Sequence, residues 1–174
     1  MKLSDFLKSF DKPIEKQMKR ENSLELADGT YEMELVDAYH GEKNGYEHFM
    51  FSLKVASGEE EGMRENIFTP LETTTRTGKD MPEYVINKSI YLIRAIGHCV
   101  GLEVTPDMFD KETTTEIYET LREEFMDYRG SKLMLTIYTK PNNNNPEYPY
   151  RNYLIKEASK SIQEATEIET EFPF

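Results

Sequence analysis

The sequence contains one cysteine, no tryptophan and three histidines in 174 residues. A single cysteine excludes an internal disulfide bond, and the apolar neighbours of Cys99 favour a small core side chain over a reactive thiol. His40, His48 and His98 lack the spacing of metal ligands, so we expect no metal and no cofactor. A phosphate-binding glycine loop and a Gly-x-Ser-x-Gly elbow are also missing, which argues against an enzyme.

Long hydrophobic runs are missing as well. No stretch approaches the roughly 18 apolar residues that a membrane-spanning helix needs, so we expect no membrane association. Residues 1–6 are too charged for a secretory signal, which predicts a cytoplasmic protein. The chain length is typical of one domain with additional segments.

Positive charge is scarce overall, with a formal net charge of −12, but it is unevenly distributed. Residues 1–20 and residues 131–156 each carry a net charge of +3. Residues 101–130 carry −6 and residues 157–174 carry −4. Because a ligand responds to the local potential rather than to the total, an acidic chain with two basic segments remains compatible with nucleic-acid binding.

Alternation of apolar and polar residues predicts three strands, at residues 30–40, 47–56 and 63–71, joined by glycine-containing turns. On the first strand, Tyr31, Met33, Leu35 and Tyr39 are predicted to face the core, and Ala38 the opposite side. Helical spacing then predicts two helices within residues 82–129, the first opened by Pro82. Two further strands follow, at residues 132–140 and 148–156.

This order predicts a mainly β protein with helices: a five-stranded OB-fold barrel whose helical insertion, at about residues 82–129, separates strands three and four. The domain would span residues 28–156. Residues 1–27 are predicted to form an amphipathic helical segment, which either packs on the domain or serves as a dimer or DNA contact. Residues 157–174 are predicted to be a flexible acidic tail.

A binding surface is predicted from aromatic and basic residues, because single-strand binders stack bases on rings and track phosphates with cations. OB-folds use the face of strands two and three and the adjoining loops. An alternative is that half of these rings fill the core, and strand alternation places Tyr150 and Tyr153 on opposite faces. The candidates are His48, Lys54, Arg64, Phe68, Arg76, Lys79, Tyr138, Lys140, Tyr148, Tyr150, Arg151 and Tyr153.

The end of the sequence combines acidic residues with two phenylalanines: Glu169 and Glu171 precede Phe172, Pro173 and Phe174. Apolar side chains at an exposed acidic end tend to dock in a partner. This ending resembles the acidic tail of the bacterial single-stranded-DNA-binding protein, which ends in Pro-Phe. The resemblance implies that these five residues recruit replication or recombination proteins.

The body of the chain carries a second resemblance. The segment from Gly29 to Ala38, the strand from Phe49 to Val55, the glycine turn into residues 62–68 and the last strand with Asn152 are similar to a phage family of OB-fold single-strand binders. The resemblance implies a single-stranded-DNA-binding protein that acts in phage replication, recombination or repair, in the host cytoplasm. Homo-oligomerisation stays open. The alternative is an acidic OB-fold adaptor, or a DNA-mimic inhibitor, that binds no nucleic acid.

Overall fold

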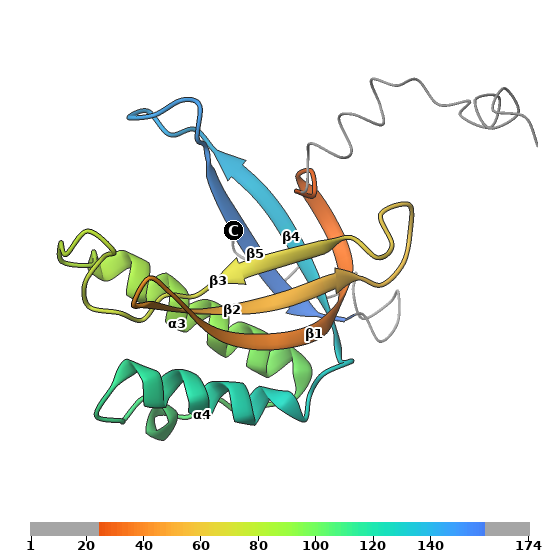
Figure 1. Cartoon of the computed structure of the whole chain (residues 1–174). Coiled ribbons are helices and arrows are strands. Elements are labelled where there is room, and N and C mark those ends of the chain that lie inside the picture. The colour runs from red at the N-terminus through yellow and green to blue at the C-terminus, as the bar shows by residue number, and fades with distance from the viewer. Residues whose placement is uncertain (1–24, 159–174) are drawn as a thin grey trace, which may run out of the picture.

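The computed structural model describes residues 25–158, so residues 1–24 of the predicted helical segment and residues 159–174 of the predicted tail lie outside the described residues. Residues 25–27 are not helical, and Glu157 is the last residue of a strand, so both predicted boundaries were wrong by a few residues. Within residues 25–158 the chain forms five strands, two α-helices and one short 3-10 helix (Figure 1). In chain order these are β1 (Gly29–Lys43), β2 (Tyr46–Val55), β3 (Arg64–Phe68), α3 (Glu83–Val100), η1 (Pro106–Met108), α4 (Thr114–Met126), β4 (Lys132–Lys140) and β5 (Tyr150–Glu157). The predicted order of three strands, helices and two strands is confirmed.

The five strands form one antiparallel sheet in the order β3-β2-β1-β4-β5. The 15-residue strand β1 is shared between the two halves of the sheet. Its first part, Gly29 to Glu34, pairs with β4, and its longer second part, Met33 to Lys43, pairs with β2. The strand curves strongly between these partners, so the two halves of the sheet face each other across the core (Figure 1).

A β-bulge in β1 corrects one prediction about which side chains face the core. The pairing of β1 with β2 shifts between Leu35 and Asp37, so Val36 is an extra residue opposite β2. Such a residue reverses the inward and outward alternation of everything after it. Ala38 is therefore buried at 3% exposure, whereas Tyr39 points outward at 45%. The prediction of an inward Tyr39 was wrong because regular alternation was extended through the bulge.

Side chains connect the two edge strands of the sheet. Glu65 of β3 is buried and accepts two hydrogen bonds from Arg151 of β5, from Nε at 2.8 Å and from Nη2 at 2.9 Å. The Tyr153 hydroxyl donates a third hydrogen bond to Glu65 at 2.7 Å. Because β3 and β5 lie at opposite edges of the sheet, these contacts require the sheet to curl round upon itself.

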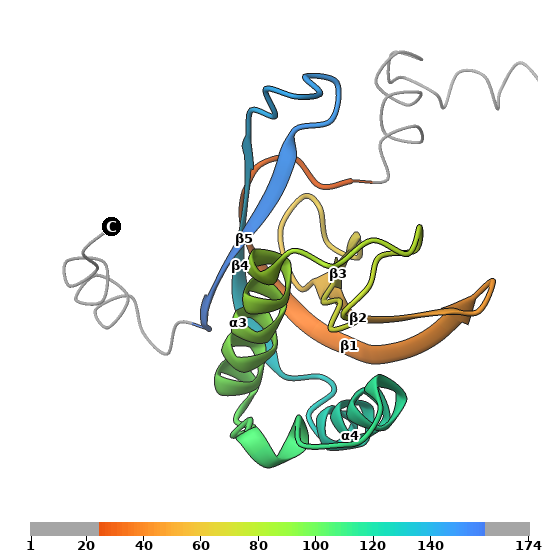
Figure 2. The ribbon, with the colours of Figure 1, turned by 90° about the vertical axis from the view of Figure 1, so that its left-hand side faces the viewer.

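The helix α4 covers the inner side of β1 and β2, as Figure 2 shows. Its Tyr118 ring stacks on Phe49 of β2, with ring centroids 5.3 Å apart, and its Phe125 ring meets Phe51 edge-on at 4.8 Å. Thr113 begins the helix, since its side-chain oxygen accepts the backbone N–H of Glu116. Aromatic burial thus fixes α4 against the sheet.

The helix α3 runs beside β5 and is held at two points along one stripe of residues (Figure 2). Lys88 Nζ donates to Asn152 at 2.9 Å, and His98 Nε2 lies 2.7 Å from a carboxylate oxygen of Glu157. Gly101 ends the helix with φ +97°, a left-handed conformation that glycine adopts without strain. Within the described part of the chain, neither helix has the length and hydropathy required to cross a membrane.

Candidate functional site

Apolar and aromatic side chains form a row on the outward face of β1, β2 and β3. The strand register places Tyr39 beside Met50 and Met50 beside Phe68. The imidazole of His48 lies between two of these rings, with its centroid 5.8 Å from Tyr39 and 6.1 Å from Phe68. Tyr39 is 45% exposed and Phe68 is 58% exposed. We call these four residues the aromatic row, and their rings are available to a ligand with planar groups.

Gly41 allows the His48 and Tyr39 rings to lie close together. It pairs directly with His48 across the β1–β2 ladder. A Cβ atom at this position would lie 2.5 Å from a ring carbon of Tyr39 and 2.6 Å from Nε2 of His48. Both distances are far below van der Waals contact, so any side chain here would displace the two rings. The aromatic row therefore requires glycine at position 41, because only a residue without a side chain leaves room for the two rings.

The loop between β3 and α3 brings two of the predicted cations to one end of this face. Tyr46, on the same face of β2 as His48, donates its hydroxyl proton to the Thr74 carbonyl at 2.9 Å. The Arg76 guanidinium lies 5.9 Å from the centroid of the Tyr46 ring, within cation–π range. Lys79 is exposed in the same loop. The loop is therefore tied to β2, and it carries Arg76 beside Tyr46 at one end of the face.

Two further cations lie at the opposite end of the face. Lys54 of β2 is paired in register with Arg64 of β3. Lys54 also lies 3.7 Å from a carboxylate oxygen of Glu34, whereas Arg64 is exposed. Between this end and the aromatic row, the register places Asp37 and Asn66 on either side of Ser52. The face thus runs from a cationic loop, over aromatic rings and a small polar row, to a second cationic end.

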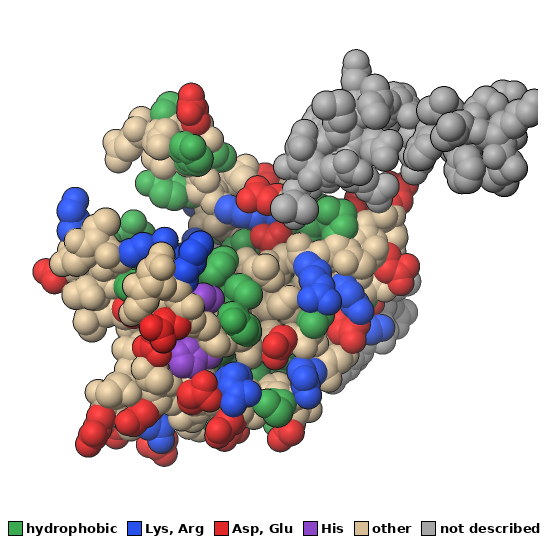
Figure 3. Space-filling view, viewed as in Figure 1, with side chains coloured by type: hydrophobic (Ala, Val, Ile, Leu, Met, Phe, Trp, Pro, Cys, Tyr) green, Lys and Arg blue, Asp and Glu red, His purple; other side chains and the backbone are tan. Residues whose placement is uncertain are grey.

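Many acidic side chains lie on α4, below the sheet. In the space-filling view, apolar, basic and some acidic side chains share the centre of the face, and further acidic side chains lie along its lower edge over α4 (Figure 3). On α4 the exposed acidic residues include Glu116, Glu123 and Glu124. These three carboxylates therefore lie on a helix below the sheet and not within the aromatic row, whereas Glu34 and Asp37 lie on the face itself.

Four of the predicted site residues belong to a separate surface. Tyr138 pairs with Asn152, and Lys140 pairs with Tyr150, on the face of β4 and β5 opposite to the buried Ile137 and Ile155. Tyr138 is 39% exposed, Tyr150 is 50% exposed, and Tyr148 in the connecting loop is 68% exposed. Lys140 Nζ lies 5.8 Å from the centroid of the Tyr138 ring. These side chains are accessible, but they do not join the aromatic row of β1–β3.

Arg151 and Tyr153 point inward, and both donate hydrogen bonds to Glu65. The hydrogen bond to Glu65 raises the pKa of Arg151, and Arg151 Nη2 also donates to the Leu26 carbonyl at 2.8 Å. Burial and the hydrogen bond to Glu65 raise the pKa of Tyr153. Their polar groups hold β5 to β3, so we do not include them in the interface. The predicted opposite orientation of Tyr150 and Tyr153 is confirmed.

Two aromatic residues of the outward face were missing from the sequence-based candidates. Tyr39 was assigned to the core because the bulge at Val36 leaves no signature in the pattern of apolar residues. Tyr46 was overlooked because it follows a turn, although its spacing of two residues from His48 places both on one side of β2. Counting back in steps of two from His48 identifies Tyr46, whereas Tyr39 requires knowledge of the bulge.

Two further polar groups, His40 and Cys99, lie away from the aromatic row. His40 lies 2.8 Å from Glu119 and 3.0 Å from Glu47, one contact for each ring nitrogen. Both ring nitrogens of His40 are therefore engaged by carboxylates. Burial raises the pKa of the Cys99 thiol to about 11, which keeps it protonated at neutral pH. Across residues 25–158, no group of three potential metal ligands converges.

Comparison with models of known protein families gave no match, and comparison with curated proteins gave none either.

Proposed function

We propose that this chain is a single-stranded-DNA-binding protein with an OB-fold, acting in phage DNA replication or recombination in the host cytoplasm. The observation that supports this best is the exposed aromatic row, flanked by Arg76 and Lys79 at one end and by Lys54 and Arg64 at the other. Rings accept the faces of any base, and cations neutralise phosphates, so such a face suits sequence-tolerant binding of a single strand.

The OB-fold part of the proposal is supported by the strand order β3-β2-β1-β4-β5 and by the side-chain bridge from β3 to β5. An OB-fold has five strands in a partly open barrel and binds oligonucleotides on strands two and three. The aromatic row occupies this position. The face of β1–β3 therefore has both the side chains and the position in the sheet that binding of a single strand to an OB-fold requires.

Binding should be measured by fluorescence anisotropy with labelled single-stranded DNA, duplex DNA and RNA at about 50 mM salt. The native chain should prefer single-stranded to duplex DNA. Because a stacked base contributes about 1–3 kcal/mol, Phe68→Ala or Tyr39→Ala should weaken binding about 5- to 150-fold. Met126→Ala, which removes a 39% exposed side chain on α4, is the matched control. Equal affinity for duplex and single strands would contradict the proposal.

The salt dependence provides a second measurement. Four cations, Lys54, Arg64, Arg76 and Lys79, line the ends of the face. At about −0.7 per neutralised phosphate, the slope of log affinity against log salt should be about −3. Replacing Arg76 and Lys79 together by Gln should reduce the slope by about 1.4. A slope near zero for the native chain would mean that these cations do not contact a nucleic-acid backbone.

The proposed role of the acidic tail is recruitment of a replication or recombination protein through Glu169, Glu171, Phe172, Pro173 and Phe174. The support is the sequence resemblance alone, since these residues lie outside the described range. Deleting residues 164–174 should leave the melting temperature and oligonucleotide affinity intact while abolishing retention of at least one partner. A fall in melting temperature with unchanged partner retention would show that the tail packs on the domain instead.

A second candidate function is favoured by the exposed acidic residues of α4. An acidic adaptor or DNA-mimic inhibitor would present this helix to a basic protein and would bind no oligonucleotide. The anisotropy experiment distinguishes the two functions, because an adaptor or DNA-mimic inhibitor would show no binding to any of the labelled oligonucleotides.

A further inference from the structure

A second group of exposed rings lies where α3 runs beside β5. On α3, Tyr84 is 69% exposed and Tyr91 is 49% exposed. These residues are seven apart, with Lys88 between them, so all three share one helical stripe. Lys88 donates to Asn152 of β5, and therefore the stripe faces the β4–β5 hairpin. We call Tyr84, Lys88, Tyr138, Lys140 and Tyr150 the hairpin–α3 surface.

The two contacts between α3 and β5 fix how their residues are aligned. Lys88 meets Asn152, and ten residues later His98 meets Glu157, five residues along β5. At about 1.5 Å per helical residue and 3.3 Å per strand residue, both spacings are about 15–17 Å, so the elements run side by side in the same direction.

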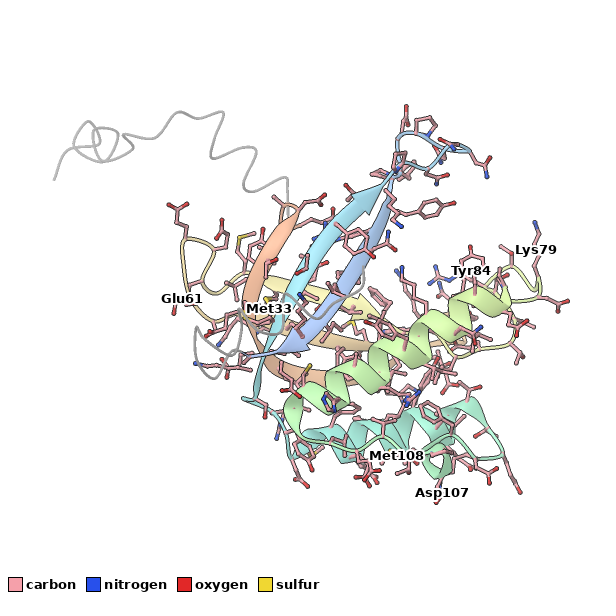
Figure 4. All side chains as sticks on the ribbon, turned by 180° about the vertical axis from the view of Figure 1, so that it is seen from behind. Met33, Glu61, Lys79, Tyr84, Asp107 and Met108 are labelled. Carbon is pink, nitrogen blue, oxygen red and sulfur yellow. The ribbon has the colours of Figure 1, made fainter. Side chains whose placement is uncertain are left out.

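This alignment places two exposed rings at a similar level along the helix and the strand. Tyr84 precedes Lys88 by four residues, about 6 Å along the helix, and Tyr150 precedes Asn152 by two residues, about 7 Å along the strand. Tyr84 and Tyr150 therefore lie at a similar level, both before the Lys88–Asn152 hydrogen bond, one on the helix and the other on the strand. Figure 4 shows the hairpin projecting above the end of α3 that carries Tyr84.

The charge of this surface suits a polyanion. The exposed cations are Lys140, beside the Tyr138 ring, and Arg94, about one turn beyond Tyr91. Burial lowers the pKa of Lys88 but its ammonium group is held at the surface by Asn152. The acids on α3 and on the β4–β5 hairpin are Glu83, Glu147 and Glu157, fewer than the six Lys and Arg residues of the same segments, so the surface is slightly basic on a chain of net charge −12.

The β3–α3 loop connects this surface to the aromatic row. The loop begins directly after Phe68 and ends at α3, just before Tyr84. Its Arg76 lies against Tyr46 on the outward face, and Lys79 lies at the same end of α3 as Tyr84 (Figure 4). A nucleic-acid strand that leaves the aromatic row on this side would meet these two cations next, and then the tyrosines of the hairpin–α3 surface.

We infer that the hairpin–α3 surface is a second subsite for single-stranded nucleic acid, which holds the nucleotides that extend beyond the aromatic row past the β3–α3 loop. The inference rests on the proposed function and assigns to it a longer binding site with two aromatic platforms. Tyr84 and Tyr150 are the rings on which bases stack at this subsite, and Lys140 contacts a phosphate.

The test compares a short with a long oligonucleotide, since one such domain occupies about 4–16 nucleotides. Labelled oligothymidylates of about 6 and about 20 nucleotides are titrated with the native chain, with Tyr84→Ala/Tyr150→Ala and with Tyr84→Phe/Tyr150→Phe. The double alanine variant should bind the long strand at least about fivefold more weakly and the short strand within twofold of the native chain. The phenylalanine variant should bind both as the native chain does, because it keeps the rings.

The results distinguish failure of the second subsite from failure of the proposed function. Unchanged affinity of the alanine variant for the long strand would overturn the second subsite and leave the proposed function intact. An equal loss at both lengths would also overturn it, because the rings would then belong to a single site. Failure of the native chain to bind either strand would overturn the proposed function together with this inference. Met126→Ala serves again as the control, and matching melting temperatures confirm that the variants are folded.

Discussion

Glu65 is the residue on which we expect the curled arrangement of the sheet to depend. Glu65→Gln retains the size of the side chain but removes its charge, leaving the guanidinium of Arg151 in a mostly buried position without a counter-ion. Breaking a buried ion pair from one side costs about 3–5 kcal/mol. Arg151 keeps its hydrogen bond to Leu26 and is 20% exposed, so we expect the lower end, about 3 kcal/mol.

A loss of this size is large against a total unfolding free energy of about 5–15 kcal/mol. For a chain of this length, 1 kcal/mol corresponds to a shift in melting temperature of about 2–4 °C, so Glu65→Gln should melt about 6–12 °C lower. Thermal and urea unfolding followed by circular dichroism provide the measurement. The matched control is Glu32→Gln, which removes an exposed partner 3.6 Å from Lys132 and should cost less than about 1 kcal/mol.

The loss from Glu65→Gln can be tested by a rescue. Replacing all three bonded residues with apolar ones, as Glu65→Leu with Arg151→Met and Tyr153→Phe, removes the polar side chains together and should restore part of the lost stability, with the Leu26 carbonyl losing the hydrogen bond from Arg151. If Glu65→Gln melts at the same temperature as Glu32→Gln, the contact between β3 and β5 does not hold the edges of the sheet together.

Three further outcomes follow from the geometry. Asp37→Asn should tighten oligonucleotide binding about two- to threefold at low salt, as expected from removing a charge about 7 Å from a phosphate in water; unchanged affinity would place the strand elsewhere. Gly41→Val should weaken binding about fivefold with little change in melting temperature, because the added side chain displaces the His48 ring, and native-like affinity would refute this role. Hydrogen bonds from His40 and Arg122 lower the pKa of Glu119 from 4.5, so its stabilising effect is present above pH 4.5 and is lost below it. The difference in unfolding free energy between the native chain and Glu119→Gln should therefore narrow as the pH falls through this range, and a constant difference would contradict the assignment.

The order and extent of the regular elements could be predicted from the sequence because each is encoded locally. The fourth strand was predicted at residues 132–140, and β4 spans Lys132–Lys140. The alternation of Phe49, Phe51 and Leu53 identified the buried face of β2 correctly. These signals need only neighbours in the chain, and they decide the class of fold.

The candidate site was harder to predict because it depends on contacts between distant residues. Arg151 has the sequence context of a ligand-binding cation, and only the position of Glu65, 86 residues earlier, shows that its charge is neutralised. The division of the predicted site into two surfaces depends in the same way on the path of α3 beside β5. Composition identified the residue types, whereas the topology determined which of them meet.

The extra residue at Val36 has a consequence for how this surface is encoded. The outward position of Tyr39 is set by its pairing with Met50 of β2, because the bulge absorbs the extra residue between Leu35 and Asp37. Removing Val36 would convert the bulge into a regular ladder in which Asp37, Ala38 and Tyr39 keep their present partners on β2, so Ala38 would stay in the core and Tyr39 on the surface. A chain related to this one could therefore lose this residue and still present the aromatic row.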